Sequence, residues 1–411
     1  MTGLDPFRPD GSNRVVVTGM GAVSGFGLGV ARMWDGIVEG RSSIRPTVRS
    51  FDTLEVTRPA ATVPDYDPSE HFSNVDVLTS EPFSQFGQIA AREAIAQAGL
   101  EAEHLRDAAV ILGCGGGGEQ SREEAARQLF GKKRPRAHPT TVPRTNHQAA
   151  VGLIAIEHQI FGPGFIVATG CAAGSHAVAQ AAMMLRHGYA QFALTGGTEA
   201  NVLYCSMRAF DSARTVASDT CRPFSKDRSG LALGEGAGVL VLETMDSALK
   251  RGAEIIGEIA GFGMSCDAGD TLQPTRRGPV RAVTIALRDA GLAPEDIGYV
   301  SAHGTGTPLN DVVETRAVRE VFGAHADRLM MSSTKSQIGH TFGAAGGLEL
   351  IATLKGLQEE VVPPTVNYLG PDPECDIDCV PNSAREIRIG AAVKQSFAFG
   401  GVNAALAVRR V

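Results

Sequence analysis

Short apolar runs alternate with longer amphipathic stretches along most of this sequence. Runs of four or five residues, rich in β-branched side chains, predict buried strands at 15–18, 108–112, 165–168, 192–195, 239–243, 299–302, 329–332 and 404–408. Apolar residues that recur every three or four positions predict helices at 84–98, 172–187, 279–290, 311–322 and 344–358. This alternation is typical of an α/β protein.

Two of these strand-to-helix segments share one layout. Strand 165–168 runs through Thr169 and Gly170 into Cys171 and a helix of small residues. Strand 329–332 runs through Lys335 and His340 into a second helix rich in Ala and Gly. The shared layout indicates an internal duplication. Because no flexible linker separates the segments, we expect two closely packed halves.

The composition narrows the class of protein. The chain has 411 residues, of which 49 are glycine, 43% are hydrophobic and 20% are charged. These values exclude a disordered chain, and the glycines lack the repeat of a collagen. The length predicts two or three domains, or one large duplicated domain. The glycine excess predicts tight strand-to-helix turns built around a site.

Net charge, hydropathy and cysteine spacing narrow the expected binding partners and cellular location. The formal net charge is −7, which argues against nucleic-acid binding because that needs a basic surface. No apolar run reaches the roughly 18 residues that a membrane span needs, and no signal-like segment opens the sequence. The seven cysteines form no CxxC pair, as expected for reduced thiols in the cytoplasm.

Cys171 is the candidate nucleophile. It follows a strand and a tight turn at Thr169 and Gly170, and it opens a helix. A helix N-terminus favours the thiolate, and a tight turn exposes the sulfur. The alternative for a lone cysteine is a small buried hydrophobic residue, and we keep that interpretation for the other six.

Two histidines, His303 and His340, lie in polar turns of small residues. Metal ligands would need short spacing such as HExxH or a companion cysteine pair, so we predict no metal site. A pair of neutral imidazoles could instead donate two hydrogen bonds to one oxyanion. Each histidine, taken alone, is more often a structural residue with satisfied hydrogen bonds.

Lys335 and Glu314 accompany these histidines in the sequence. If they are buried in the glycine-rich turns, we expect them to pair and to orient the imidazoles, because an unpaired buried charge is costly. The alternative is an ordinary exposed pair.

Other glycine-rich segments differ in their implications. The segment 396–403 places two phenylalanines beside Gly400 and Gly401, which indicates a hydrophobic lid on a hinge or a turn at the end of a strand. The segment 18–25 lacks the third glycine of a dinucleotide fingerprint and predicts a tight turn. The run 115–118 precedes no GKS or GKT, so it predicts no phosphate loop.

Four motifs together carry a family resemblance. The turn at Cys171, HGTGTPLND at 303–311, STKSQIGHTFGAAG at 333–346 and FAFGGVN at 397–403 follow one another in this order. The set resembles that of the β-ketoacyl-acyl carrier protein synthases, the elongating condensing enzymes of fatty acid and polyketide synthesis. The resemblance implies a thiolase fold, a duplicated five-layer α/β/α/β/α arrangement. We place a tail at 1–13, a half with the nucleophile at 14–258 and a half with both histidines at 259–411.

The resemblance also implies a reaction. Cys171 would take an acyl chain, and His303 and His340 would bind the thioester oxygen of malonyl. Loss of CO2 would leave an enolate that attacks the acyl-Cys171 carbonyl. No bound cofactor is implied, because both substrates arrive on the phosphopantetheine of acyl carrier protein.

The remaining motif residues take supporting roles by the same resemblance. They are Lys335 and Glu314 beside the histidines, the amides of Cys171 and Phe399 as an oxyanion hole, Ala398, Phe399 and Gly400 as a gate, and Thr305, Thr307, Phe210 and Phe397 as substrate contacts.

Gly116 departs from the family pattern. It lies where family members commonly carry a bulky aliphatic side chain that closes the acyl pocket. Removing such a side chain would open roughly 100 Å3. We therefore predict a long or bulky acyl chain, such as a polyketide or polyene, with Phe210 as a pocket wall. Housekeeping fatty acid elongation is the alternative.

The resemblance also predicts partners. Family members form homodimers, or heterodimers with a non-elongating chain-length partner that lacks the nucleophile, and Cys171 argues against the latter identity for this chain. The basic stretch Lys132, Lys133, Arg134 and Arg136 is either a solvated loop or a docking patch for an acidic carrier protein.

Overall fold

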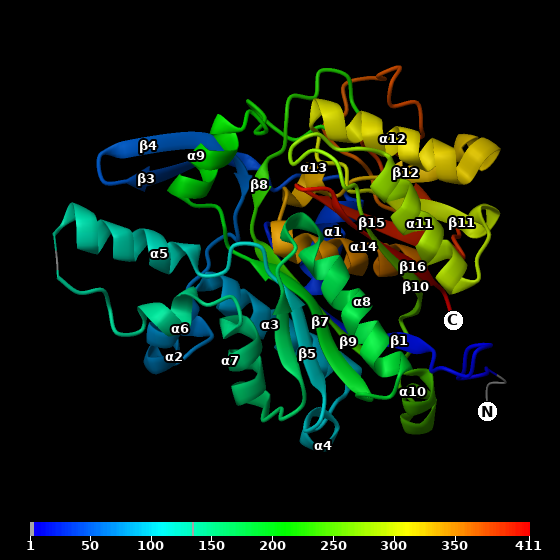
Figure 1. Cartoon of the computed structure of the whole chain (residues 1–411), viewed down its shortest axis with the longest axis horizontal. Coiled ribbons are helices and arrows are strands. Elements are labelled where there is room, and N and C mark those ends of the chain that lie inside the picture. The colour runs from blue at the N-terminus through cyan, green and yellow to red at the C-terminus, as the bar shows by residue number, and fades with distance from the viewer. Residues whose placement is uncertain (1–3, 134) are drawn as a thin grey trace.

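The main strands form one continuous mixed sheet path, and its two matching halves are the two sheet layers of the fold. This computed structural model describes residues 4–133 and 135–411, and Figure 1 shows the arrangement. Eleven strands are joined in the order β12-β11-β15-β16-β10-β1-β9-β7-β5-β6, with β2 (Gly27–Leu28) beside β1. The N-terminal half uses β1 (Val15–Ser24), β5 (Ala109–Gly113), β6 (Gly164–Val167), β7 (Phe192–Glu199) and β9 (Gly236–Thr244). The C-terminal half uses β10 (Gly257–Cys266), β11 (Ile297–Ser301), β12 (Met330–Ser332), β15 (Ala391–Ala398) and β16 (Val402–Arg409).

The two halves have the same strand topology. In each, the five strands lie in the order third, second, fourth, fifth, first. The third and fourth strands pair in parallel with the second, and the fifth strand pairs antiparallel with the fourth and the first. The duplication predicted from two strand-to-helix segments is therefore confirmed over both sheets.

Helices separate and cover the two sheets. Two central helices, α8 (Ala173–Arg186) and α14 (Ala345–Glu359), contact each other and strands of both halves. On the outer faces, α3 (Pro82–Ala98) and α7 (Ala149–His158) cover the N-terminal half, and α11 (Arg277–Ala290) and α12 (Pro308–Phe322) cover the other (Figure 1). This is the expected five-layer α/β/α/β/α arrangement.

Glycines in the first strand of each half let an outer helix approach closely. A Cβ at Gly21 of β1 would lie 1.9 Å from the carbonyl oxygen of Ala90 in α3. A Cβ at Gly263 of β10 would lie 2.0 Å from the carbonyl oxygen of Ala282 in α11. The segment 18–25, predicted to be a tight turn, is thus mostly part of the buried strand β1. Its glycines serve helix packing.

The halves share one core. The first strands β1 and β10 pair through Val16 with Glu258 and Val17 with Gly257. One apolar cluster includes Val15 of the first strand and Val408 of the last. The division that we placed between residues 258 and 259 falls inside β10, and it stays a prediction.

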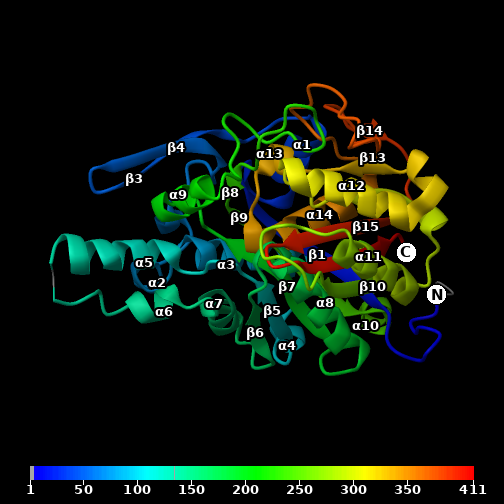
Figure 2. The same ribbon diagram turned by 45° about the horizontal axis from the view of Figure 1, so that its top comes forward.

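Smaller elements form a projection beside the N-terminal half. The hairpin β3 (Arg45–Phe51) and β4 (Leu54–Ala61), α5 (Glu119–Ala126), α6 (Thr141–Thr145) and α9 (Tyr204–Ser212) extend on one side of the sheets in both views (Figure 2). No helix among the described residues is long and apolar enough to span a membrane. The other elements are α1 (Val30–Val38), α2 (Asn74–Thr79), α4 (Ala102–Leu105), β8 (Leu233–Gly234), α10 (Met245–Arg251), α13 (Lys335–Ile338), β13 (Val361–Val362) and β14 (Arg385–Glu386).

Candidate active site

Cys171 lies in the turn between β6 and α8. Gly170 before it has a φ of 56°, in the left-handed region that favours glycine. A Cβ at Gly170 would lie 3.7 Å from the Cβ of Ala398, so the lid segment packs on the nucleophile turn. Cys171 itself is only 9% exposed and belongs to an apolar cluster that includes Phe342 and Met207. The predicted exposure of its sulfur is therefore wrong.

Burial also changes the expected protonation of Cys171. It raises the pKa of the thiol to about 12, while the positive charge of Lys335 acts in the opposite direction. At this position desolvation outweighs the charges that favour a thiolate. Burial thus favours the thiol form, whereas Lys335 and the helix N-terminus favour the predicted thiolate.

The structure brings His303 and His340 together. Their ring centroids are 5.5 Å apart and their planes meet at 83°. His303 follows β11 and His340 follows α13, and neither is more than 4% exposed. The backbone N–H of Phe342 donates to Nδ1 of His340 over 3.3 Å. The proton of His340 therefore lies on Nε2, where it can be donated to a substrate.

Both imidazoles are neutral at pH 7. Burial lowers the pKa of each well below its ordinary value, and the positive charges of Lys335 and Lys394 lower it further. Nδ1 of His303 is buried and has no hydrogen-bond partner among the described residues. The two rings have the protonation required of the predicted pair of hydrogen-bond donors to one oxyanion.

Lys335 and Glu314 do not form the predicted pair. Glu314 accepts backbone N–H bonds from His303 and Gly304, each 2.7 Å long, and so fixes the loop that carries His303. Burial raises the pKa of Glu314 to about 7. Lys335 is fully buried and its Nζ pairs with Glu349 of α14. The alternative of an exposed Lys335–Glu314 pair is equally wrong.

The lid segment joins β15 to β16. Phe397 is buried, with its ring centroid 5.5 Å from that of His303, whereas Phe399 is 50% exposed. Gly400 has a φ of 80°, and its N–H donates over 2.9 Å to the carbonyl of Thr271. The segment is therefore a strand-end turn and is also held by a neighbouring loop. Phe399 lies at the surface, and its predicted role as a gate stays a prediction.

The threonines of the His303 loop lie next to each other. The Oγ1 atoms of Thr305 and Thr307 are 2.9 Å apart. Thr305 is buried and Thr307 is half-buried at the start of α12. Both threonines thus lie in the loop that carries His303, between His303 and α12.

Comparison with known proteins identifies the family. The family model described as Beta-ketoacyl synthase, N-terminal domain matches residues 12–248. The model described as Beta-ketoacyl synthase, C-terminal domain matches residues 256–369. The chain belongs to the β-ketoacyl synthase family.

Full-length relatives support this assignment. Nodulation protein E of Rhizobium sp. (strain N33) is 43% identical over 404 residues, covering 97% of this synthase and 99% of the relative. A 3-oxoacyl-[acyl-carrier-protein] synthase 2 of Synechocystis is 40% identical over 407 residues, covering 97% and 98%. This synthase is accordingly an acyltransferase.

Solved structures agree with the fold. The ishigamide ketosynthase/chain length factor matches with a TM-score of 0.92 at 36% identity, covering 97% of this synthase and 100% of that chain. A type II polyketide synthase acyl-carrier protein in complex with its ketosynthase, bound to the hexaketide, matches with a TM-score of 0.89 at 29% identity, covering 97% and 100%. The synthase has the duplicated thiolase fold predicted from its motifs.

The apolar cluster around Cys171 continues toward a cavity. Phe210 packs against this cluster, and its ring centroid is 5.0 Å from that of Phe342. Val202 and Tyr204 belong to the cluster or pack on it, and they also line a cavity of about 600 Å3. The synthase therefore has space beyond the apolar cluster.

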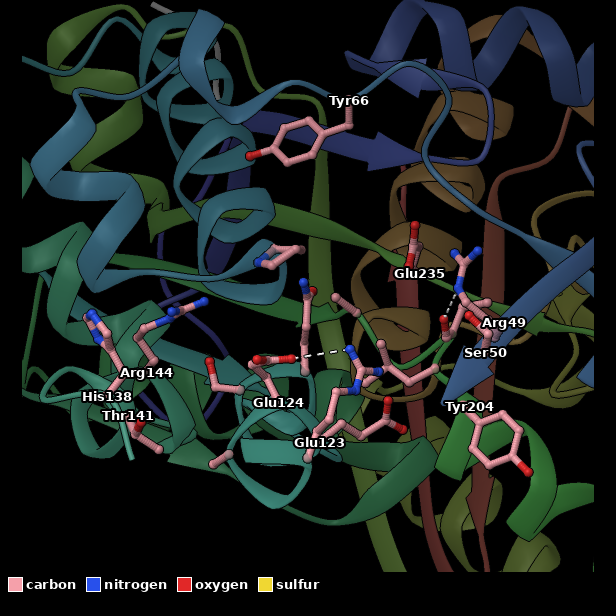
Figure 3. A pocket seen from close by; sticks show the side chains of 18 of the residues that line it. Arg49, Ser50, Tyr66, Glu123, Glu124, His138, Thr141, Arg144, Tyr204 and Glu235 are labelled. Atoms are coloured by element: carbon pink, nitrogen blue, oxygen red, sulfur yellow. Dashed lines mark hydrogen bonds and ion pairs between the residues drawn. The ribbon is translucent and has the colours of Figure 1, made fainter. Parts of the chain in front are cut away.

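The cavity walls are largely polar. Figure 3 shows Arg49 and Glu235 on one side of the cavity and His138 and Arg144 on the other. Glu235 is largely buried and accepts the N–H of Val63 over 3.0 Å, and burial raises its pKa to about 7.

Gly116 does not open the acyl pocket in the way we predicted. A Cβ at Gly116 would lie 2.8 Å from Nδ2 and 3.2 Å from Cγ of Asn201. The side chain of Asn201 thus fills the space that a residue at Gly116 would take. The N–H of Gly116 instead donates to the buried carboxylate of Glu199 over 3.1 Å.

The basic stretch lies on the projection of the N-terminal half. Lys132, Lys133 and Arg136 are exposed, and Arg134 lies outside the described residues. The stretch follows α5 and precedes α6. Within residues 4–133 and 135–411, no group of three or more His, Cys, Asp or Glu side chains is placed to hold a metal ion.

Three buried charged residues at the site were missed in the sequence. Glu349 pairs with both Lys335 and Lys394, and Glu199 accepts N–H bonds from Gly115 and Gly343. A signal was present for the first two, because Glu349 interrupts the apolar face of α14 and Lys394 interrupts the apolar run of β15. A charge inside a buried element is seldom tolerated without a partner.

Proposed function

We propose that the synthase catalyses decarboxylative Claisen condensation of an acyl chain on Cys171 with malonyl-acyl carrier protein. The product is a 3-oxoacyl-acyl carrier protein. The observation that carries this proposal is the contact between the nucleophile turn and the histidines through Phe342. Phe342 shares an apolar cluster with Cys171, and its ring stacks on that of His340 with centroids 4.6 Å apart. The His340 ring in turn lies 5.5 Å from that of His303. No cofactor is needed, because the phosphopantetheine of the carrier protein brings both substrates.

The first step is acyl transfer. The sulfur of Cys171 attacks the thioester carbonyl of the acyl carrier protein, its proton leaves, and the carrier thiol departs. The charge of Lys335 and the start of α8 both favour the thiolate that must form. We assign the oxyanion of this step to the backbone N–H groups of Cys171 and Phe399.

The second step is loss of CO2 from malonyl. The bond to the carboxylate breaks, and its electron pair moves into the thioester to give an enolate oxygen. We assign this oxygen to the N–H groups of His303 and His340, which are neutral and buried. The enolate carbon then attacks the acyl carbonyl, and the sulfur of Cys171 leaves as the carbon–carbon bond forms.

Lid residues and threonines complete the proposal. The exposed ring of Phe399 would gate malonyl entry by moving on the hinge at Ala398 and Gly400. Thr305 and Thr307 would hydrogen-bond the phosphopantetheine arm. Phe397, packed on His303, would shape the substrate-binding site beside the reacting atoms.

A long or bulky acyl chain, such as a polyketide or polyene, would extend past Val202 and Tyr204 into the cavity, whose polar walls would favour a chain that carries oxygen atoms. A cavity of about 600 Å3 lies within the usual range for a ligand site, roughly 300–1,000 Å3. This support replaces the argument from Gly116. Housekeeping fatty acid elongation remains the second candidate, and relatives named 3-oxoacyl-[acyl-carrier-protein] synthase 2 favour it.

To test this, the synthase is incubated with carrier proteins that carry saturated or polyene acyl chains of graded length. Mass spectrometry of the intact protein follows acylation of Cys171, and the 3-oxo product is measured after malonyl carrier is added. We expect acylation at Cys171, no product from Cys171→Ala, and preference for long or unsaturated chains. Condensation by Cys171→Ala would reject the catalytic assignment. A preference for short saturated chains would favour fatty acid elongation.

We also propose a dimer, formed with a second copy or with a chain-length partner. β6 ends the sheet path, and its other edge pairs with no strand in the described residues. Phe165 on this strand is 39% exposed and Phe161 before it is 72% exposed. Light scattering compares the molar mass of Phe165→Lys with that of the unchanged protein, and we expect the variant to be monomeric. Equal masses for the two proteins would reject an interface at this edge.

We further propose a cytoplasmic location, in keeping with seven unpaired cysteines.

The basic stretch Lys132, Lys133, Arg134 and Arg136 is our candidate docking patch for the acidic carrier protein. We would replace Lys132, Lys133, Arg134 and Arg136 by Ala. The KM for a carrier-bound acyl chain should rise, because the variant loses both the electrostatic steering and the contacts that these residues provide. Reaction with a free thioester analogue should be unchanged. Equal loss with both substrates would count against docking at this loop.

A further inference from the structure

Lys394 is a buried charged residue to which the proposed mechanism assigns no role. It lies on β15, and its side chain is fully buried. Its Nζ lies 2.9 Å from Oε2 of Glu349, donates to the carbonyl of Gln395 over 2.8 Å, and donates to Oγ of Ser396. Gln395 and Ser396 accept hydrogen bonds, and the carboxylate of Glu349 forms an ion pair with Nζ. Burial lowers the pKa of Lys394, whereas the charge of Glu349 raises it and favours the ammonium form. We take Lys394 as the cation of this ion pair.

This cation and Lys335 share a single carboxylate. Glu349 offers one oxygen to Nζ of Lys335 and the other to Nζ of Lys394, and all three side chains are buried. Two ammonium groups face one carboxylate, so the cluster carries one unbalanced positive charge. Lys335 and Glu349 alone would form a neutral pair. Lys394 is what makes the cluster positive.

The cluster also reaches the nucleophile's helix. Because Oγ of Ser396 accepts from Lys394, its own proton can be donated to Oγ of Ser175, 2.9 Å away on α8. Lys394 thus links α14, which follows His340, to α8, which follows Cys171. Phe397, whose ring packs against that of His303, is three residues along the same strand.

We propose that Lys394 is a positioning residue for the condensation: it holds Glu349 and Ser396 and keeps a net positive charge behind His303 and His340 while the enolate forms. The proposal rests on the proposed function, because it assigns a role within that reaction. A positive charge in a buried site stabilises a developing enolate and keeps the adjacent imidazoles neutral. Acylation of Cys171 creates no enolate and needs this charge less.

The charged groups around the histidines come from several elements. Lys335 on α13, Lys394 on β15 and Glu349 on α14 form the cluster, and Glu314 on α12 holds the His303 loop. The cations lower the pKa of both histidines. Removing the charge of Lys394 should therefore raise the histidine pKa values and move the acidic limb of the pH–kcat profile to higher pH.

The test compares Lys394→Met with Lys355→Met. Lys355 lies on the same helix as Glu349, but its partner Glu359 is largely exposed, so it is a matched control for loss of a lysine. With Lys394→Met we expect kcat for condensation to fall about tenfold, the effect of one unit charge near the reacting atoms. The KM for malonyl carrier and the acylation rate of Cys171 should change less than about twofold. Lys355→Met should match the unchanged protein.

A second variant keeps the proposal testable if Lys394→Met does not fold. Lys394→Gln keeps a hydrogen-bond donor toward Ser396 without the charge, and the same fall in kcat and the same pH shift are expected. Full activity in either folded variant overturns the proposal. A parallel fall of acylation, condensation and melting temperature also overturns it, since that shows a structural role only. If the unchanged protein acylates Cys171 but forms no 3-oxo product, the proposed function itself fails.

Discussion

The two halves of the synthase hold the loop after their second strand with a buried carboxylate, but they do so differently. After β5, Gly115 and Gly116 donate to Glu199 over 2.7 and 3.1 Å. After β11, His303 and Gly304 donate to Glu314 over 2.7 Å each. Glu199 also accepts from Gly343 of the other half over 3.1 Å, whereas Glu314 stays within its own half.

This difference shows which parts of a duplicated scaffold carry the chemistry. Strand order and pairing are the same in both halves, so topology alone assigns no role. The third strand leads to Cys171 in one half and to Lys335 and His340 in the other. Because α8 and α14 contact each other between the sheets, the unlike turns meet at one site.

The largest expected effect separates the chemistry of the halves. Replacing His303 by Ala removes one donor from the enolate oxygen but leaves Cys171 and its turn in place. Condensation should fall about 100- to 1000-fold, while acylation of Cys171 is retained. Intact-mass measurement reports acylation, and product formation reports condensation. If both steps fell equally, the assignment of the steps to separate halves would be wrong.

The next prediction tests the symmetry of the scaffold. Gly21→Ala and Gly263→Ala each push a Cβ to about 2 Å from a helix carbonyl. Each should lower the free energy of unfolding by about 1–3 kcal/mol or more. Urea unfolding measures both, with Gly390→Ala as the control, because a Cβ at Gly390 would have no contact within 4 Å and its φ lies outside the left-handed region. A large effect in one half only would break the equivalence.

A smaller effect concerns the two carboxylates and pH. Burial raises the pKa of Glu199 and of Glu314 to about 7, above the value of about 4.5 in the unfolded chain. Each therefore binds a proton more tightly when folded. Its contribution to stability is complete below about pH 4.5 and is lost as pH rises through 7.

Between pH 5 and 8, the free energy of unfolding should fall less steeply with pH in Glu199→Gln and in Glu314→Gln than in the unchanged protein. The difference in slope should correspond to up to about one proton fewer released on unfolding. Urea unfolding at several pH values gives these slopes, and the exposed Glu55→Gln serves as control. Unchanged slopes in both variants would show that the two carboxylates are ionised throughout this range.

The smallest expected effect is at Gly116. A Cβ at Gly116 would meet the end of the Asn201 side chain, whose Oδ1 accepts a hydrogen bond from Ser206 over 2.6 Å. Gly116→Ala should cost about 1 kcal/mol or less and leave the chain-length profile unchanged. Acylation with graded chains checks this. A shift toward shorter chains would restore Gly116 as a determinant of chain length.

The sequence was sufficient to predict eight of the main strands and five of the main helices. It failed at β10 and β15 for opposite reasons. β10 is rich in glycine because α11 packs against its backbone, so its apolar pattern is weak. β15 carries buried Lys394 next to Gln395 and Ser396, which breaks the run of apolar residues.

At the site, motif order led us to group Cys171, His303 and His340 as the reacting residues, and their roles stay a prediction. It did not identify the buried residues that support them. The partner of Lys335 depended on packing between α13 and α14, and spacing along the chain pointed to Glu314 instead of Glu349. The thiol's protonation depended on burial, which a turn motif does not report.

The place of β16 in the sheet has a consequence for biosynthesis. β16 lies between β15 and β10, although it is the last strand of the C-terminal half in sequence. That half cannot close its sheet until residues 402–409 have left the ribosome. The N-terminal half has all five of its strands once residue 244 is out. The nucleophile's half can therefore fold during translation, whereas the histidine half, and with it the complete site, is assembled only when synthesis reaches β16.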